Sequence, residues 1–172
     1  MTSPTPVQRA VIPALLRGRD AIAIAHTGSG KTASFALPIL SALAPDPYGV
    51  FALVLSPTRE LAFQLAEQFR ALGVGCGLRD AVVVGGLDQL SQARELSRRP
   101  HVVVASPGRL RALFAADPSL RGAFAKLRFL VMDEADRLLE DSFEGDLAAV
   151  LQGVAPRPRS DGDGSARQTV LV

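Results

Sequence analysis

Short apolar runs rich in β-branched residues recur along this 172-residue chain, and longer segments with apolar residues three and four positions apart separate them. We expect strands at the apolar runs, which cover residues 20–25, 51–56, 81–85, 101–106, 129–133 and 168–172. We expect helices where the helical period holds, at residues 5–16, 32–43, 57–72, 89–98, 107–115 and 134–151. This alternation predicts an α/β fold, a parallel β-sheet sandwiched by α-helices.

The length and composition indicate one soluble globular domain over residues 1–172, because 48% of the residues are apolar and 21% are charged. Residues 156–167 are rich in Pro, Gly, Ser, Asp and Arg, which predicts a flexible loop within that domain. No apolar run approaches the ~20 residues that span a bilayer, and no secretory signal begins the chain. We therefore expect an intracellular protein with no membrane partner.

The charged residues say little about partners. The net charge of +2 does not by itself predict a nucleic-acid partner, and Cys76 has no partner for a disulfide or a metal site. Only Lys31 and Lys126 among the 19 basic residues are lysines, so an anion site here would consist mostly of guanidinium groups. A GC-rich genome explains the same bias without any function.

A candidate phosphate-binding loop follows the first predicted strand, at residues 25–32 (Ala-His-Thr-Gly-Ser-Gly-Lys-Thr). Glycines let successive N–H groups face a phosphate, the lysine reaches the β and γ phosphates, and the last threonine binds Mg²⁺. The general phosphate-binding pattern opens with Gly, where this chain has Ala25. The alternative to a phosphate-binding loop is a glycine-rich turn that contains Lys-Thr by chance. The predicted ATP-binding residues of this loop are Thr27, Gly28, Ser29, Gly30, Lys31 and Thr32.

Two acids end the strand predicted at 129–133, and such an acid lies at the sheet edge where ligands bind. We expect Asp133 to be the second anchor of Mg²⁺ beside Thr32, through water. Glu134 is placed to orient or deprotonate the water that attacks the γ-phosphate, so the predicted catalytic residues are Glu134, Lys31 and Asp133. The alternative is that both acids only offset a helix dipole.

Two more strands end in a similar motif, Ser-Pro-Thr-Arg at 56–59 and Ser-Pro-Gly-Arg at 106–109. In each motif Ser can cap a helix and Pro can take its first position, which leaves free N–H groups and an arginine at the sheet edge. The pair predicts binding to successive phosphates of an extended single strand, whereas each motif alone could be only a good helix start. The predicted residues of this surface are Pro57, Thr58, Arg59, Gly85, Gly86, Ser106, Pro107, Gly108 and Arg109.

These motifs together resemble the DEAD-box family of superfamily 2 RNA helicases. The matching segments, in order, are 4–8 (Q motif), 25–32 (motif I), 57–62 (motif Ia), Gly85-Gly86, 106–109 (motif Ib) and 133–136 (motif II). The resemblance implies a RecA-like lobe that uses ATP and Mg²⁺ and contacts RNA phosphates or sugars through Arg59, Gly86, Ser106 and Arg109. It also implies that Gln8 reads the adenine edge and that Asp136 couples the ATP site to motif III.

Finer features resemble the DEAD-box helicase 49 branch, at residues 46–51, 66–69, 85–88 and 95–98. This implies a role in ribosome biogenesis, pre-ribosomal protein partners and a nuclear or nucleolar location. The chain departs from the DEAD-box family pattern in three ways. The aromatic residue upstream of the Q motif would precede Met1, Ser106 replaces the usual Thr of motif Ib, and the chain stops at Val172, before motif III. We therefore expect a lobe truncated before motif III, without the second helicase lobe and its arginine fingers.

Three functions remain open on sequence alone. The leading one is the ATP-binding lobe of an ATP-dependent RNA helicase, which remodels RNA together with its second lobe. A DNA-directed ATPase of superfamily 2 is disfavoured because Gln8 with residues 133–136 matches the RNA-acting subfamily. The third is a non-catalytic module that binds ATP or RNA without turnover.

Overall fold

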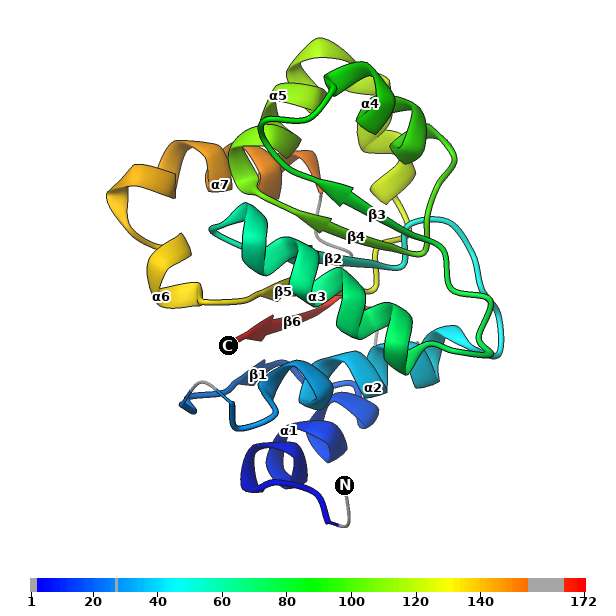
Figure 1. Ribbon diagram of the computed structural model, residues 1–172, viewed down its shortest axis with the longest axis vertical. Coiled ribbons are helices and arrows are strands. Elements are labelled where there is room, and N and C mark those ends of the chain that lie inside the picture. The colour runs from blue at the N-terminus through cyan, green and yellow to red at the C-terminus, as the bar shows by residue number, and fades with distance from the viewer. Residues whose placement is uncertain (1–2, 27, 155–165) are drawn as a thin grey trace.

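The computed structural model describes residues 3–26, 28–154 and 166–172 (Figure 1). Its strands are β1 (Ala21–Ile22), β2 (Ala52–Leu55), β3 (Asp80–Val83), β4 (Val102–Ala105), β5 (Phe129–Met132) and β6 (Gln168–Leu171). Its helices are α1 (Pro6–Leu16), α2 (Lys31–Leu43), α3 (Arg59–Leu72), α4 (Gln89–Ser97), α5 (Pro107–Ala116), the 3-10 helix η1 (Pro118–Phe124), α6 (Ala135–Leu138) and α7 (Asp141–Gly153). The predicted alternation of strands and helices is confirmed.

The strands form one parallel sheet in the order β1-β6-β5-β2-β4-β3. The chain moves outward to β3 through α2 and α3 on one face, then returns to β6 through α4, α5, α6 and α7 on the other. Right-handed crossovers produce this pattern. It brings the carboxyl ends of all six described strands to one edge of the sheet, where ligands bind in such folds.

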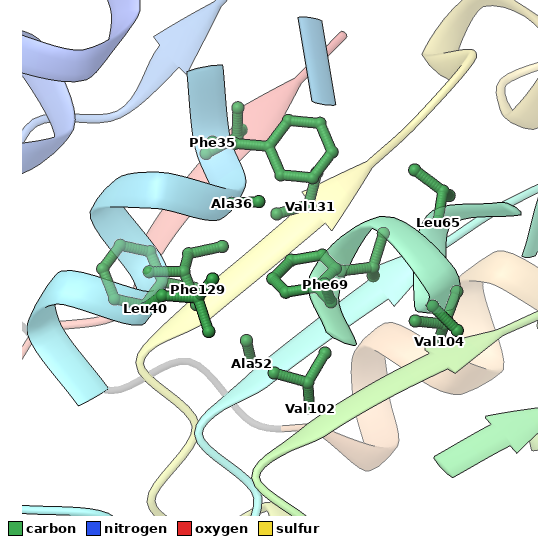
Figure 2. Close-up of a cluster of buried hydrophobic side chains, with 14 of the residues drawn as sticks. Phe35, Ala36, Leu40, Ala52, Leu65, Phe69, Val102, Val104, Phe129 and Val131 are labelled. Atoms are coloured by element: carbon green, nitrogen blue, oxygen red, sulfur yellow. The ribbon is translucent and has the colours of Figure 1, made fainter. Parts of the chain in front are cut away.

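Alternation along the strands divides the interior into two cores. In β2, Ala52 and Val54 face the core under α1, α2 and α3, whereas Leu53 and Leu55 face the core under α4, α5 and α7. Figure 2 shows the first core, where Phe35 of α2 and Phe69 of α3 lie over the strands. Because β2, β4 and β5 are buried on both faces, their continuous apolar runs could be recognised in the sequence.

Side chains of β6 fasten the amino-terminal helix to the sheet. Gln168 Nε2 donates to the carbonyl of Leu15 at 3.0 Å and to that of Arg19 at 2.8 Å. The Thr169 N–H donates to Asp20 Oδ1 at 2.8 Å. These bonds fix the end of α1 beside β1, the strand that leads into the phosphate-binding loop.

Three expectations need correction. The helix expected over 134–151 is two helices, because the chain becomes extended at Glu140 (ψ 152°) between α6 and α7. The 3-10 helix η1 was not expected; Asp117 caps it, and its apolar residues fill the second core. The strand expected at 20–25 is only Ala21–Ile22, because its pairing with β6, its one partner among the described strands, covers only these two residues.

Most of the predicted loop 156–167 lies outside the described residues. None of the helices in the described ranges combines the length and apolar character that crossing a membrane requires.

Candidate nucleotide and nucleic-acid site

The phosphate-binding loop joins β1 to α2, as the sequence predicts. Helix α2 begins at Lys31, and Gly30 before it is left-handed (φ 85°) with no side-chain cap on the helix. A Cβ atom at Gly30 would lie 2.5 Å from Gln8 Nε2, so both backbone and space require glycine there. The uncapped helix start leaves its first N–H groups available to an anion. Thr27 lies outside the described residues.

Ser29 supplies a second indication that the loop is built for a ligand. Its Oγ atom is buried and has no hydrogen-bond partner among the described residues. A buried hydroxyl without a partner is unfavourable, and such groups in native structures call for an explanation. A bound phosphate oxygen would accept a hydrogen bond from this hydroxyl, so the residues present fit a nucleotide.

Gln8 is buried beside the loop and links it to α1. Its Oε1 accepts from the Thr5 N–H at 3.1 Å, and its Nε2 donates to the carbonyl of Gly30 at 3.2 Å. The first bond is half of a capping box, because the Thr5 hydroxyl in turn accepts from the Gln8 N–H. The structure therefore gives Gln8 a bridging position that the sequence did not indicate.

Asp133 and Glu134 stand at the end of β5, as predicted. Asp133 is 5% exposed, and this burial raises the pKa of its carboxyl to about 6. Glu134 adds to the increase by its charge, whereas Lys31 and a backbone hydrogen bond from Glu134 oppose it. Lys31 and Asp133, a hundred residues apart in the sequence, are thus close enough to interact electrostatically.

Glu134 carries local backbone strain. It lies in the left-handed region (φ 51°, ψ 52°), which is unusual for a residue with a side chain, and such strain clusters at functional sites. Its carboxylate pairs with Arg137 at 3.0 Å from Oε2 to Nη1. Arg137 was not among the predicted site residues, and nothing but its i+3 spacing from Glu134 could have indicated it.

A cavity of about 610 Å³ opens between the phosphate-binding loop, α6 and the ends of β1 and β6. Lys31, Glu134 and Asp136 are among its lining residues. Gln8 and Thr32 do not line it; Gln8 lies instead against Gly30. The structure therefore brings the predicted catalytic lysine and base to one cavity and leaves the predicted adenine reader outside it.

The donor set fits a metal that keeps water ligands. Within residues 3–26, 28–154 and 166–172, no three His, Cys, Asp or Glu side chains gather as a complete metal-binding group. Mg²⁺ commonly binds through one or two protein oxygens together with substrate phosphates and water. The predicted ligands are Thr32, in the first turn of α2, and Asp133, which follows β5 and interacts electrostatically with Lys31, the chain neighbour of Thr32.

The two serine-proline motifs differ in their local structure. In the first, Thr58 rather than Ser56 caps α3, accepting from the Leu61 N–H at 3.2 Å, so the predicted cap at Ser56 is wrong. In the second, Ser106 does hold the cap position with Pro107 first in α5, but its side chain makes no capping bond. The Ser106 hydroxyl is thereby left for another partner.

The two predicted arginines both contact the segment that follows β3, Arg59 at the glycine pair and Arg109 at the residues on either side of it. Arg59 lies against Gly86, which is left-handed (φ 79°), so a Cβ atom there would collide with the guanidinium. Arg109 donates from Nε to the carbonyl of Val84 at 3.1 Å and from Nη2 to that of Leu87 at 2.6 Å. The structure thus gathers these residues on one loop, which we call the glycine loop (residues 85–88).

The start of α5 has an acidic neighbour that the sequence did not reveal. A Cβ atom at Gly108 would lie 2.6 Å from Asp146 Oδ2, and Asp146 also pairs with Arg111 at 2.6 Å. A carboxylate at a helix N-terminus interacts favourably with the helix dipole. The predicted anion site at Gly108 therefore already has a protein carboxylate beside it. Pro107, the other predicted residue at this helix start, is buried.

Comparison with proteins of known sequence gives consistent matches. The chain is 60% identical over 159 residues to DEAD-box ATP-dependent RNA helicase 36 of Oryza sativa subsp. japonica, covering 92% of this chain and 32% of the rice protein. It is 57% identical over 174 residues to the probable ATP-dependent RNA helicase DDX49 of Homo sapiens, covering 99% and 34%. The chain spans about a third of the length of these relatives.

Solved structures match over nearly the whole chain. Mss116p (NTE and C-tail double deletion) bound to ssRNA and AMP-PNP superposes with a TM-score of 0.83 at 31% identity, covering 99% of this chain and 35% of that one. A hypothetical ATP-dependent RNA helicase from Sulfolobus tokodaii gives a TM-score of 0.79 at 32% identity, covering 99% and 46%. The expected RecA-like fold is confirmed.

The family model described as DEAD/DEAH box helicase matches residues 5–172, a range that runs from the cap of α1 to the end of β6 and contains both candidate sites. Because this family model matches nearly the whole chain, and relatives at 57–60% identity agree with it, the chain belongs to the DEAD/DEAH box helicase family.

Proposed function

We propose that this chain is the ATP-binding lobe of an ATP-dependent RNA helicase, which binds ATP with Mg²⁺ and an RNA backbone at one sheet edge. The observation that carries the proposal is the convergence of Lys31, Asp133 and Glu134 on the phosphate-binding loop. Because a buried acid, a lysine and an uncapped helix start meet there, the site suits a polyphosphate with its cation.

In the nucleotide site each side chain has a separate task. Lys31 and the N–H groups of the loop, from Thr27 to Thr32, hold the phosphates of ATP. Thr32 and Asp133 would hold Mg²⁺, which would neutralise phosphate charge. Glu134 orients the attacking water and accepts its proton, and Asp136, exposed on the cavity wall, couples the site to motif III.

Gln8 selects adenine in this proposal, and its hydrogen-bonding capacity allows it. A side-chain amide has two N–H donors and two acceptor positions, and Gln8 uses one of each on Thr5 and Gly30. The remaining donor and acceptor match the adenine edge. Its bond to Gly30 would then link base recognition to the shape of the phosphate-binding loop.

The RNA surface is the part of the same edge that carries the glycine loop. Backbone N–H groups at Gly86 and Gly108, the Ser106 hydroxyl, and the unused donors of Arg59 and Arg109 suit phosphate and ribose oxygens. These groups do not read bases, so we infer binding that is independent of sequence. Pro57, Thr58, Gly85 and Pro107 contribute by shaping the backbone of this surface.

The finer parts of the proposal rest on family resemblance. They are a second RecA-like lobe that completes the active site, a role in ribosome biogenesis with pre-ribosomal partners, and a nucleolar location. RNA-bound Mss116p, with which the chain superposes, supports the choice of RNA.

Binding and turnover measurements on two variants test the nucleotide site. Lys31→Ala should weaken ATP binding at least ~10-fold, because Lys31 contacts the ground-state phosphates, whereas Glu134→Gln should bind ATP nearly as the parent does. Calorimetric titration with ATP measures both. If Glu134→Gln abolished ATP binding, its role as base would be wrong and a structural role would replace it.

A steady-state ATPase assay with and without single-stranded RNA tests the need for a second lobe. In this proposal the arginine fingers come from the second lobe, and such a finger is typically worth ~10³–10⁵ in rate. We therefore expect at most trace hydrolysis from the 172-residue chain alone. Robust RNA-stimulated turnover by the monomer would contradict this expectation. ATP and RNA binding with no turnover, even after addition of the second lobe of a relative, would favour the non-catalytic module.

A further inference from the structure

The end of β3 leaves one buried carbonyl without a strand to pair with. β3 is an edge strand, and β4 is the only described strand that lies beside it. The Val83 carbonyl faces β4 and accepts from the Ser106 N–H at 3.0 Å, so the Val84 carbonyl points to the open edge. Val84 is fully buried, and a buried carbonyl needs a donor.

Two side chains supply that donor from the same side. Gln92 of α4 donates from Nε2 to the Val84 carbonyl at 3.0 Å, and Arg109 donates to it from Nε at 3.1 Å. Arg109 continues to the Leu87 carbonyl and to Gln89 Oε1, at 2.6 and 3.3 Å. The glycine loop is therefore held before its first residue and again at Leu87.

Gln92 is held at a cost to stability. Its side chain is 4% exposed, and its Oε1 has no hydrogen-bond partner among the described residues. An apolar side chain of the same length would fill this space without a buried orphan oxygen. Since Arg109 already satisfies the Val84 carbonyl, the stability of the fold does not explain an amide here.

We propose that Gln92 is a positioning residue of the RNA surface: it fixes the Val84 carbonyl and thereby the direction in which the glycine loop presents its N–H groups to an RNA backbone. The proposal rests on the RNA-binding role proposed above. Gln92 itself is buried and touches no RNA; it acts through the loop. A loop held in advance binds more tightly, because less conformational entropy is lost on binding.

The chain offers a matched control for this residue. Gln168 is buried to the same degree, at 5% exposed, and its Nε2 also donates to backbone carbonyls, but those belong to Leu15 and Arg19 beside β1. Gln92→Met removes one of the two donors to the Val84 carbonyl. Gln168→Met removes the donor to the carbonyls of Leu15 and Arg19, which lie beside β1, at the opposite end of the sheet from β3 and the glycine loop. Both variants exchange an amide for an apolar chain of similar length.

Three readouts on the full 172-residue chain decide the matter: RNA affinity for a labelled oligouridylate at several salt concentrations, ATP affinity, and hydrogen exchange of the loop amides. Gln92→Met should weaken RNA binding about 5- to 10-fold with an unchanged salt slope, because no charged contact is lost. Its ATP affinity and melting temperature should stay near those of the parent, and exchange should accelerate only at residues 85–88. Gln168→Met should lower the melting temperature and leave RNA affinity unchanged.

The outcomes separate this proposal from the proposed function. Unchanged loop exchange in Gln92→Met, or unchanged RNA affinity with faster exchange, overturns the positioning role. A parent chain that does not bind RNA at all overturns the RNA function; faster loop exchange in Gln92→Met would still show that this glutamine fixes the loop. Equal loss of RNA affinity in both variants would show a general effect of stability and also overturn the proposal.

Discussion

Replacement of Gln8 by Met should alter both the stability of the chain and its choice of nucleotide. Gln8 is 4% exposed and makes hydrogen bonds to Thr5 and to Gly30. At about 1 kcal/mol net for each bond, the loss is about 2 kcal/mol. For a domain of this size that lowers the melting temperature by ~4–8 °C.

The effect on selectivity follows from the same side chain. An amide that reads adenine leaves its own groups unpaired against guanine, which costs about 1–3 kcal/mol, so the parent should prefer ATP to GTP by ~5-fold or more. In Gln8→Met the two affinities should come within about twofold, because methionine presents neither donor nor acceptor of comparable strength. Calorimetric titration with both nucleotides measures the ratio.

Thr5→Val is the matched control for this prediction. It removes the hydroxyl that caps α1 and leaves the Gln8 amide in position, so it should cost about 1 kcal/mol of stability without changing the nucleotide ratio. If Gln8→Met kept the ratio of the parent, Gln8 would be a structural residue only. If Thr5→Val abolished the ratio, selectivity would depend on the position of α1 as a whole.

Three further predictions concern parts of the fold outside the nucleotide site. Burial, and secondarily the charge of Arg79, lower the pKa of His101, so the unfolded chain binds a proton there more readily and this group's contribution to stability should fall as pH drops below about 6.5. Asp133, whose pKa is raised to about 6 in the fold, acts in the opposite direction, so the His101 contribution is measured as the difference in denaturant midpoint between the parent and His101→Gln from pH 5 to 8. Phe69→Ala should cost about 3–5 kcal/mol in urea unfolding, because this ring is fully buried in the first core. Asp146→Asn should tighten RNA binding several-fold by removing a carboxylate at the start of α5, whereas Glu144→Gln, exposed on the same helix, should change it little.

Local signals in the sequence were sufficient for most of the elements and for the position of the candidate phosphate-binding loop between β1 and α2. The strands β2, β4 and β5 are buried on both faces, so their side chains are apolar throughout, and the pattern depends on no distant residue. Gly30 was recognisable because the left-handed turn before α2 requires glycine whatever surrounds it. The position of Asp133 was likewise recognisable, because an acid directly after an apolar strand lies at the sheet edge.

Contacts between distant segments were decided by the tertiary structure alone. The sheet order brings Lys31 beside Asp133, and the resulting burial raises the pKa of that carboxyl to about 6, a value that no local pattern encodes. The position of β3 at the sheet edge leaves the buried Val84 carbonyl without a neighbouring strand, and Gln92 and Arg109 donate to it instead. In the sequence, Gln92 is a polar residue four positions before Leu96, on the face of α4 that is buried. A polar residue on that apolar face was the one indication in the sequence that Gln92 has a special role.

The same reasoning explains where the predicted boundaries failed. Helical period continues through residues 134–151, but α6 is tied to the end of β6 by the Ala135 N–H to Val172 carbonyl bond, at 2.9 Å, while α7 packs on α5. One straight helix cannot satisfy both contacts, so the chain breaks at Glu140. The sequence by itself determined most of the helices and strands and which residues are candidates to hold phosphate, because those depend on neighbours along the chain. The tertiary structure decided which of these residues meet, because that depends on the order of the strands.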